Sequence, residues 1–171
     1  MDNIFNIKKL DLIPLFEEFC DNLGFNNFFY GYYYDDDNNH IAHGIKEGDI
    51  GAIKYAAQKM ADLIPPNSVL IPMPSHKGYA TDTLLLAKEI QKITKTPIAD
   101  ILKGKSRMSL YSAKKMGVPI DSTYLGFKKV GDIPSGYNPV LIDNVVDTGL
   151  TAKSALETIG GNTIVSFATR K

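Results

Sequence analysis

Short apolar segments rich in β-branched residues recur along the chain, and segments of helical periodicity separate them. The apolar segments are SVLIP (68–72), PIADIL (97–102), NPVLI (138–142) and NTIVSFA (162–168). Apolar runs of this length, bounded by turn residues, are typical of strands buried on both faces of a parallel sheet. Parallel strands need crossover connections, and the intervening segments are long enough to supply helices. The sequence therefore predicts an α/β fold with a mostly parallel sheet flanked by helices.

Four segments place apolar residues at helical spacing and are predicted to be helices. They span 8–23, 49–64, 81–94 and 151–159. Asp49 is a good N-cap for the second helix, because its side chain can accept a hydrogen bond from the first turn. No repeat or compositional boundary interrupts the chain, so residues 1–171 are predicted to form a single domain whose core is 49–171.

The N-terminal part, residues 1–48, is predicted to form a hood made of the first helix and a β-hairpin. The aromatic segment 27–34 would be the first arm of the hairpin, and HIAHGI (40–45) the second. His40 and His43 would then point to opposite faces of a strand, which makes them poor partners for a metal. The aromatic run can pack as a sheet edge or offer a stacking platform for bases, and packing is the more common use of such runs.

The charge of the chain is uneven although its formal net charge is zero. Residues 1–50 hold ten acids against three lysines, whereas residues 103–129 hold seven basic residues against Asp121 alone. A local basic segment in a neutral protein favours an anion site over the coating of nucleic acid, so nucleic acid is not expected as a direct ligand. A solvated, lysine-rich surface loop remains the alternative. Residues 103–136 form an irregular stretch of a length typical of functional lids or disordered segments.

Cysteine content and hydropathy exclude several classes of protein. Cys20 is the only cysteine, which excludes an internal disulfide and a cysteine-based zinc cluster. No apolar run is long enough to span a bilayer, and the N-terminus lacks the features of a secretory signal. The sequence predicts a cytoplasmic protein that does not bind a membrane.

The segment VLIDNVVDTGLT (140–151) combines a buried strand, acids and a hydroxyl-rich turn before a helix. Ligands of open α/β sheets bind beyond the carboxyl ends of the strands. A helix that starts near Thr151 offers unpaired amides and a positive dipole to a phosphate, and Gly149 allows a close backbone approach. Asp143 is suited to accept hydrogen bonds from sugar hydroxyls. The pattern predicts a ribose 5-phosphate pocket; an ordinary polar strand end, with Thr151 as N-cap, is the alternative.

Residues Leu141–Thr151 resemble the phosphoribosyl-pyrophosphate (PRPP) signature of type I phosphoribosyltransferases. The Lys-x-Gly, helix and Ile-Pro-Met-Pro order of residues 44–63 and 68–90 is similar to that of the competence protein F-like (ComF-like) subfamily. The resemblance covers about residues 27–171. It implies a type I phosphoribosyltransferase-like fold that moves ribose 5-phosphate from PRPP to a small nitrogenous acceptor, such as a nucleobase, with Mg²⁺ and release of pyrophosphate. Since dimers are common among such proteins, it also raises the prospect of a homodimer.

The resemblance assigns roles to residues of this chain. Asp143 and Asn144 occupy the positions of the acidic pair that holds the ribose hydroxyls, and Asp143 could meet the metal through PRPP and water. Asp147 is the candidate general base. The 5-phosphate loop would be Asp147, Thr148, Gly149, Leu150 and Thr151. The pyrophosphate would meet Pro74, Ser75, His76, Lys77 and Gly78, together with Arg107, Lys114 and Lys115 from a flexible loop (103–117) that closes over PRPP.

The chain also departs from the family pattern. Asn144 replaces the second acid, which removes a negative charge near the ribose and the magnesium ion. The pyrophosphate loop lacks the arginine-rich run usual in ComF-like proteins, and the sequence has no counterpart of their cysteine-bearing zinc module. The second hypothesis is therefore a non-catalytic PRPP- or nucleotide-binding protein with a regulatory or DNA-uptake-linked role. A plain nucleotide-binding module with an unrelated ligand is a third, weaker one. The acceptor would be chosen by residues 27–45.

Overall fold

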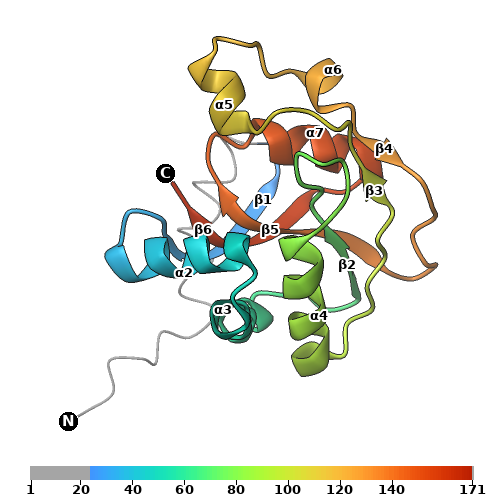
Figure 1. Ribbon diagram of the computed structural model, residues 1–171. Helices are drawn as coiled ribbons and strands as arrows, with labels where there is room; N and C mark the ends of the chain where they lie inside the picture. Colours follow the sequence, from blue (N-terminus) through green and yellow to red (C-terminus); the bar gives the residue numbers. More distant parts are fainter. Residues whose placement is uncertain (1–23, 171) are drawn as a thin grey trace.

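A computed structural model describes residues 24–170 and contains a four-stranded, fully parallel sheet (Figure 1). The strands are β1 (Asn26–Tyr32), β2 (Ser68–Pro72), β5 (Asn138–Val146) and β6 (Thr163–Thr169). Their order across the sheet is β1-β6-β5-β2, so β6 and β5 form its centre. Beyond β2, Ile98 adds a single parallel bridge to Leu70.

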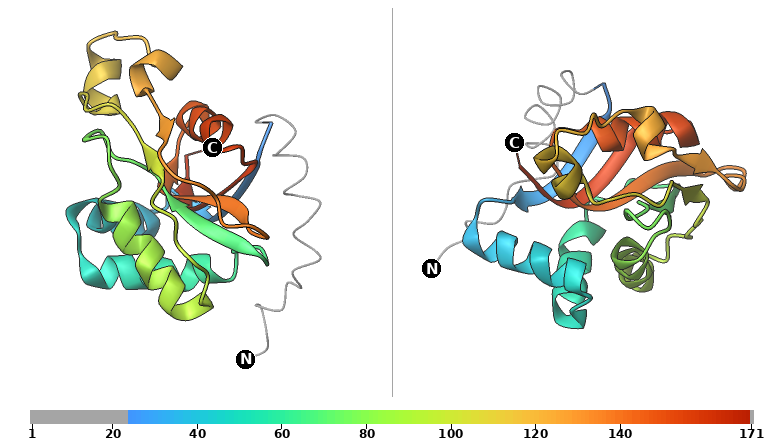
Figure 2. Two further views of the ribbon diagram at one scale, coloured as in Figure 1. Left: turned by 90° about the vertical axis from the view of Figure 1, so that its right-hand side faces the viewer. Right: turned by 45° about the horizontal axis from the view of Figure 1, so that its top comes forward.

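Helices cover both faces of this sheet (Figures 1 and 2). Three helices lie on one face: α2 (Asp36–Glu47), α3 (Ile50–Ala61) and α4 (Asp82–Thr94). The other face is covered by α7 (Leu150–Ile159). Alternate residues of β5 enter the two clusters: Ile142 packs on the first group of helices and Leu141 on the α7 side. The predicted α/β class, with a mostly parallel sheet flanked by helices, is confirmed.

Several elements coincide with the sequence-based expectation. Strand β2 has the predicted bounds, and α3, α4, α7 and β6 each differ from the predicted spans by three residues or fewer at either end. Asp49 caps α3 as expected, since its Oδ1 accepts a hydrogen bond from the amide of Ala52 at 2.6 Å. The predicted helix 8–23, with Cys20, lies outside the described residues.

The predicted β-hairpin is wrong, because residues 40–45 belong to helix α2. Two acids, Asp36 and Asp37, occupy its first turn, where they complement the helix dipole, and Gly48 ends it in the left-handed conformation with a φ of 77°. Ala42 and Ile45 are buried at helical spacing. His40 and His43 therefore sit three residues apart on a helix, close to one face, and not on opposite faces of a strand.

Strand β5 continues four residues beyond the predicted end at Ile142. Asp143 pairs in register with Ser166, and Val146 pairs with Thr169, because β6 offers backbone partners along this whole stretch. Asp143 and Asn144 are therefore strand residues. Asp147 is the first residue after the strand.

Residues 97–136 form less regular structure than the core. The predicted strand 97–102 is reduced to the Ile98 bridge and to the first residue of β3 (Leu102–Lys103), which pairs antiparallel with β4 (Lys128–Lys129). Between them lie two short helices, α5 (Leu110–Lys115) and α6 (Ser122–Leu125). Leu102, Ala113 and Leu125 are buried and anchor this segment. Between residues 24 and 170, no helix combines the length and the apolar character needed to cross a bilayer.

Candidate functional site

All four parallel strands end at one edge of the sheet, and the chain leaves the two strands β2 and β5 toward opposite faces. After β2 it leads to α4, and after β5 it leads to α7. Such a switch between neighbouring strands opens a crevice at their carboxyl ends, where open α/β sheets bind ligands. The residues directly after the strands are Tyr33, Met73, Asp147 and Arg170.

A cleft lies at this switch point and consists of two adjoining cavities of about 260 and 550 Å³. Volumes of this size are in the range of small-molecule sites. Asp143 lines both cavities, and so do Lys46 and Thr151. The first cavity continues along the turn 147–152, and the second along residues 73–77. The cleft therefore brings together the two segments that the resemblance assigns to the 5-phosphate and to the pyrophosphate.

The turn after β5 presents backbone amides to the first cavity. Gly149 has a φ of 85°, a left-handed conformation that favours glycine, and it directly precedes α7. The first amides of any helix lack an intrahelical acceptor, and here the residues that carry them, Leu150 to Ala152, line the cavity. Thr148 adds a hydroxyl beside them, which accepts a long hydrogen bond of 3.4 Å from the Leu150 amide. A helix start of this construction favours the binding of an anion.

Asp143 is a partly buried carboxyl at the point where the two cavities meet. Burial raises its pKa to about 7, and the nearby carboxylate of Asp82 raises it as well. The hydrogen bond from the amide of Asn144 to Oδ1, at 2.7 Å, and the charge of Lys46 act in the opposite direction. Near neutral pH the carboxyl is therefore poised between its two forms, so a ligand that brings hydroxyl donors or a cation will favour the ionised form.

Asn144 connects β5 to helix α2. Its Nδ2 donates a hydrogen bond of 2.8 Å to the carbonyl of Ala42, and the residue is 2% exposed. Its Oδ1 is buried and has no hydrogen-bond partner in the described part of the chain. The amide group thus has a structural role in this state, and its predicted contact with a ribose hydroxyl stays a prediction.

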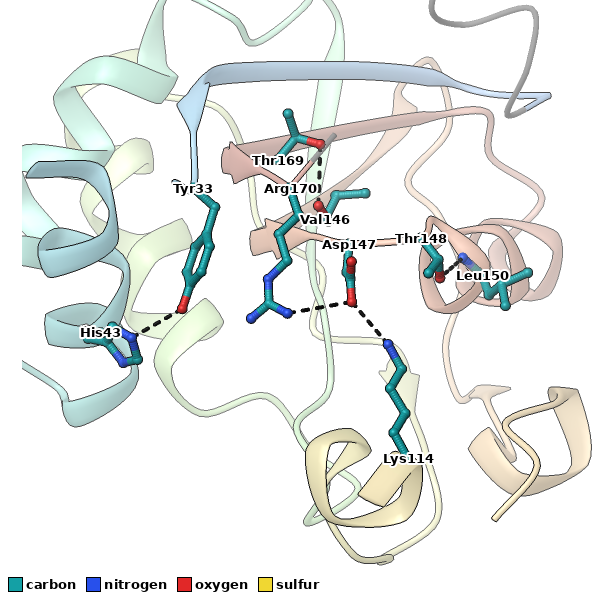
Figure 3. A network of polar contacts seen from close by, with 9 residues as sticks. All are labelled: Tyr33, His43, Lys114, Val146, Asp147, Thr148, Leu150, Thr169 and Arg170. Atoms are coloured by element: carbon teal, nitrogen blue, oxygen red, sulfur yellow. Dashed lines mark hydrogen bonds and ion pairs between the residues drawn. The ribbon is translucent and has the colours of Figure 1, made fainter. Parts of the chain in front are cut away.

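Asp147 stands between two cations at the mouth of the cleft (Figure 3). Its Oδ2 lies 3.0 Å from Nζ of Lys114, on α5, and 3.6 Å from Nη1 of Arg170, which follows β6. The guanidinium of Arg170 lies over the ring of Tyr33 at 4.4 Å from the centroid. Tyr33 in turn shares a hydrogen bond of 3.1 Å with Nε2 of His43 on α2. This network joins the ends of three strands to helix α2 and to the 103–117 segment.

The loop after β2 forms a compact wall of the second cavity. Pro74, Ser75, His76 and Lys77 line it, whereas Gly78, which the resemblance assigns to the same loop, is not part of its wall. Gly78 is buried with a φ of 93°, and its carbonyl accepts a 2.9 Å hydrogen bond from the amide of Gly104. The backbone amide of Arg107 donates a second hydrogen bond, of 2.9 Å, to the carbonyl of His76. The start of the 103–117 segment is therefore fastened to this loop.

Two of the three predicted basic residues of that segment reach the cleft. Arg107 lines the second cavity with its guanidinium beside the Tyr124 ring, at 5.5 Å from the centroid, and burial lowers its pKa from the ordinary value. Lys114 lines the first cavity. Lys115, the next residue on α5, is exposed and is not part of the wall of either cavity.

The charge of the cleft is positive in balance. Its lining contains five cationic side chains and three carboxyl groups: Lys46, Lys77, Arg107, Lys114 and Arg170, against Asp82, Asp143 and Asp147. Lys46, Asp82 and Arg170 were not predicted as site residues. Arg170 could have been found from sequence, because it directly follows the last strand, at the same sheet edge as Asp147. In the part of the chain that the structure describes, no three metal-ligating side chains gather into one group.

No protein-family model matches this chain, and no curated protein shows significant similarity to it.

Proposed function

We propose that this protein binds PRPP in the cleft and transfers its ribosyl 5-phosphate to a nitrogen of a small heterocycle, with release of pyrophosphate. The observation that carries the proposal is that the glycine turn before α7 opens onto the same cavity as the carboxyl of Asp143. An anion site next to a hydroxyl acceptor is complementary to a sugar phosphate. The excess of cationic side chains in the cleft is complementary to a ligand that carries several phosphate groups.

The two cavities suggest how PRPP lies. The 5-phosphate occupies the turn formed by Thr148, Gly149, Leu150 and Thr151, and Asp143 accepts hydrogen bonds from the ribose hydroxyls. The pyrophosphate extends into the second cavity, toward Ser75, His76 and Lys77 and toward Arg107. These groups line the two ends of one continuous cleft, with Asp143 common to both.

Magnesium fits this arrangement as a partner of PRPP and not as an ion held by the protein alone. Mg²⁺ in phosphate sites is commonly bound by substrate oxygens and water, with only one or two carboxylates from the protein. Asp143 and Asp82 both line the second cavity and interact electrostatically, so they can supply those carboxylates. The bound ion would neutralise negative charge on the departing pyrophosphate.

The residues of the cleft can support the transfer. As the bond from the ribose carbon to pyrophosphate breaks and the bond to the acceptor nitrogen forms, negative charge develops on the leaving group, where Lys77 and Arg107 stabilise it. Asp147 accepts the proton of the nitrogen if that nitrogen is protonated. The 103–117 segment, including α5, covers the reacting carbon and limits the access of water.

Binding without turnover is the second candidate function, and one observation favours it. Asn144 stands where the resemblance places a second acid, and although it lines the second cavity its Nδ2 is hydrogen-bonded to the carbonyl of Ala42. Asp143 is then the only carboxylate of the pair. A protein of this kind would sense PRPP or a nucleotide and retain the pocket without the reaction.

Pyrophosphate release, measured with PRPP, Mg²⁺ and a panel of heterocyclic bases, tests the proposed reaction. We expect release that depends on both PRPP and one class of base, and that falls at least about 100-fold in Asp147→Asn, which keeps the shape of the side chain but cannot accept a proton. Binding of PRPP without release, for every base, would assign the binding function instead. A chain that neither binds PRPP nor releases pyrophosphate contradicts both.

A further inference from the structure

Lys46 lies at the junction of the two cavities, and the proposed contacts of PRPP leave it without a role. Of the charged side chains that line the cleft, Lys46 and Asp143 are the two that border both cavities. In the proposed pose the ribose lies at Asp143, and the pyrophosphate extends from there into the second cavity. The phosphate that is bonded to the ribose therefore lies at the junction, where a lysine can reach it.

The ammonium group of Lys46 is available to a ligand. Within residues 24–170 it takes part in no salt bridge and no side-chain hydrogen bond. Two carboxyl groups, Asp143 and Asp82, border the same second cavity. Burial raises the pKa of Asp143 and the charge of Lys46 acts against this rise, so the two side chains are near enough to interact. A lysine cation is a mobile point charge that suits phosphate oxygens.

The last turn of α2, which carries Lys46, is held by two neighbouring elements. From β5, Nδ2 of Asn144 donates a 2.8 Å hydrogen bond to the carbonyl of Ala42, one helical turn before Lys46. Helix α3 packs closely against the same turn, because a Cβ atom at Gly44 would lie 2.8 Å from that of Ala52. The backbone of Lys46 therefore has a fixed place at the cleft, from which the long side chain can reach a ligand.

The contact with Ala42 needs an amide at position 144. An ionised carboxylate can only accept hydrogen bonds, so an aspartate there would meet the carbonyl of Ala42 without a donor. Asn144 is 2% exposed, and an unpaired polar group in such a buried position is costly. The amide in place of the second acid thus removes a negative charge from the cleft and also fastens the helix that brings a positive one.

We propose that Lys46 binds the ribose-linked phosphate of PRPP and that Asn144 is a positioning residue that holds this lysine in place. Negative charge grows on this phosphate as its bond to the ribose breaks, so a cation beside it favours the transfer as well as the binding. Asn144 acts through α2 and does not contact the ribose, in contrast to the role that the resemblance implies for it. The inference rests on the proposed function, because it adds a contact to the same site.

Calorimetric titration with PRPP and Mg²⁺ tests the role of Lys46, and ribose 5-phosphate, measured by its competition with PRPP, is the probe that lacks the pyrophosphate. Lys46→Met should weaken PRPP binding by about 10- to 100-fold, as expected for the loss of a charge-assisted hydrogen bond, and change ribose 5-phosphate affinity by less than about 3-fold. Lys46→Arg, which keeps the charge, should recover most of the PRPP affinity. Lys54→Met is the matched control, because Lys54 is exposed on α3 and does not border the cleft.

A double-mutant cycle tests the positioning role of Asn144. Asn144→Ala and Asn144→Leu both remove the donor to Ala42 and should weaken PRPP binding by about 3- to 10-fold, with ribose 5-phosphate affinity unchanged. Combined with Lys46→Met, either variant should add less than about 2-fold, because a residue that acts through Lys46 has nothing left to position. A residue that contacts the ribose would instead weaken both ligands, and its effect would multiply with that of Lys46→Met. Urea unfolding identifies the variants that are folded at the temperature of the titration.

Two results would overturn this inference and leave the proposed function intact. One is a Lys46→Met protein that binds PRPP as tightly as the wild-type chain, or that loses no more affinity than Lys54→Met. The other is a multiplied loss in the double variants, or a parallel loss of ribose 5-phosphate affinity. Since Lys46 is exposed, its variants decide the role of the lysine even where position 144 tolerates no change. A wild-type chain that does not bind PRPP overturns this inference together with the proposed function.

Discussion

The ammonium group of Lys114 lies 3.0 Å from Oδ2 of Asp147, so a helix of the 103–117 segment is bound across the cleft to the first residue after β5. Both side chains are about half exposed, with relative accessibilities of 50% and 40%. Exposed ion pairs contribute little to stability. The contact therefore matters for the position and charge of Asp147 and for the closure of α5 more than for the fold.

Lys114→Ala should impair ligand binding or turnover without unfolding the protein. We expect PRPP affinity, or kcat/KM where turnover is measured, to fall by about 5- to 50-fold, in line with the loss of one charge-assisted contact, and the free energy of unfolding to change by less than about 1 kcal/mol. Calorimetry and denaturant unfolding measure the two quantities. Lys115→Ala is the control, because it removes the same charge from the same helix outside the cleft. Equal losses in both variants would mean that only general electrostatic attraction is involved.

The raised pKa of Asp143 predicts a pH dependence of stability. Since the folded state holds this proton more tightly than the unfolded chain, the contribution of Asp143 to stability is largest below pH 4, falls as the pH rises and levels off above a pH of about 7. Asp143→Asn, which cannot ionise, should therefore be more stable than the wild-type chain at pH 8, by on the order of 4 kcal/mol, and the advantage should vanish near pH 4. Urea unfolding at several pH values tests this. A constant difference between the two proteins would contradict it.

The same pKa predicts that PRPP binding releases a proton. Near pH 7 a fraction of the molecules carries a protonated Asp143, and hydrogen bonds from ribose hydroxyls favour the ionised form. Calorimetric titrations with PRPP in buffers of different ionisation enthalpy measure the number of protons released on binding. At pH 7 the wild-type chain should release about half a proton more than Asp143→Asn. The comparison with this variant removes the titration of PRPP itself. Equal proton release by both proteins would show that Asp143 does not ionise on binding.

Gly78 is predicted to be essential for the shape of the loop after β2. A Cβ atom at this position would lie 2.6 Å from the carbonyl oxygen of Gly104, and its φ of 93° is unfavourable for other residues. Gly78→Ala should lower stability by at least about 2 kcal/mol and weaken PRPP binding, because the loop and the 103–117 segment must separate. Gly117 also has a positive φ, of 71°, but a Cβ atom there would meet open space. Gly117→Ala therefore measures the cost of the backbone conformation alone and should lower the free energy of unfolding by about 1 kcal/mol. Similar losses of stability in the two variants would contradict the predicted clash between a Cβ atom at position 78 and the carbonyl oxygen of Gly104.

Asn144 is predicted to stabilise the junction between β5 and α2. Asn144→Asp would place a carboxylate oxygen against the carbonyl of Ala42 in a buried position, and we expect a loss of about 2–4 kcal/mol near neutral pH. Asn144→Leu, of similar volume, should cost less, because it also removes the unpaired Oδ1. Chemical unfolding of the two variants gives the comparison. A more stable Asn144→Asp protein would mean that this position is open to the cleft and not committed to α2.

The core elements could be predicted from the sequence because their signals are local. Strand β2 and the helices α3, α4 and α7 carry uninterrupted apolar periodicity and clear end signals such as Asp49. The sequence predicts a strand at residues 40–45, within helix α2, because HIAHGI is short and its apolar residues suit either period. The acids at 36 and 37 and Gly48 are the end signals that would have identified it.

Only part of the site could be predicted, because several of its residues lie far apart in the sequence and come together only in the folded chain. The turn 147–151 is contiguous in sequence, so its chemistry could be read directly. Lys46, Asp82 and Arg170 come from three separate elements and meet Asp143 or Asp147 only when the sheet forms. The orientation of Asn144 toward α2 depends on the register of β5. The orientation of Lys115 away from the cleft depends on how α5 docks.

The most direct test of the central claim is calorimetric titration of the wild-type chain with PRPP and Mg²⁺, alongside Asp143→Ala, Thr148→Ala and Thr158→Ala. The last variant removes a hydroxyl from the far end of α7, where Thr158 bonds the carbonyl of Ser154. We predict saturable binding by the wild-type chain and by Thr158→Ala, a loss of at least about 10-fold in Thr148→Ala and a larger loss in Asp143→Ala. No binding by the wild-type chain, or equal affinity in all four proteins, would contradict the assignment of the cleft as a PRPP site.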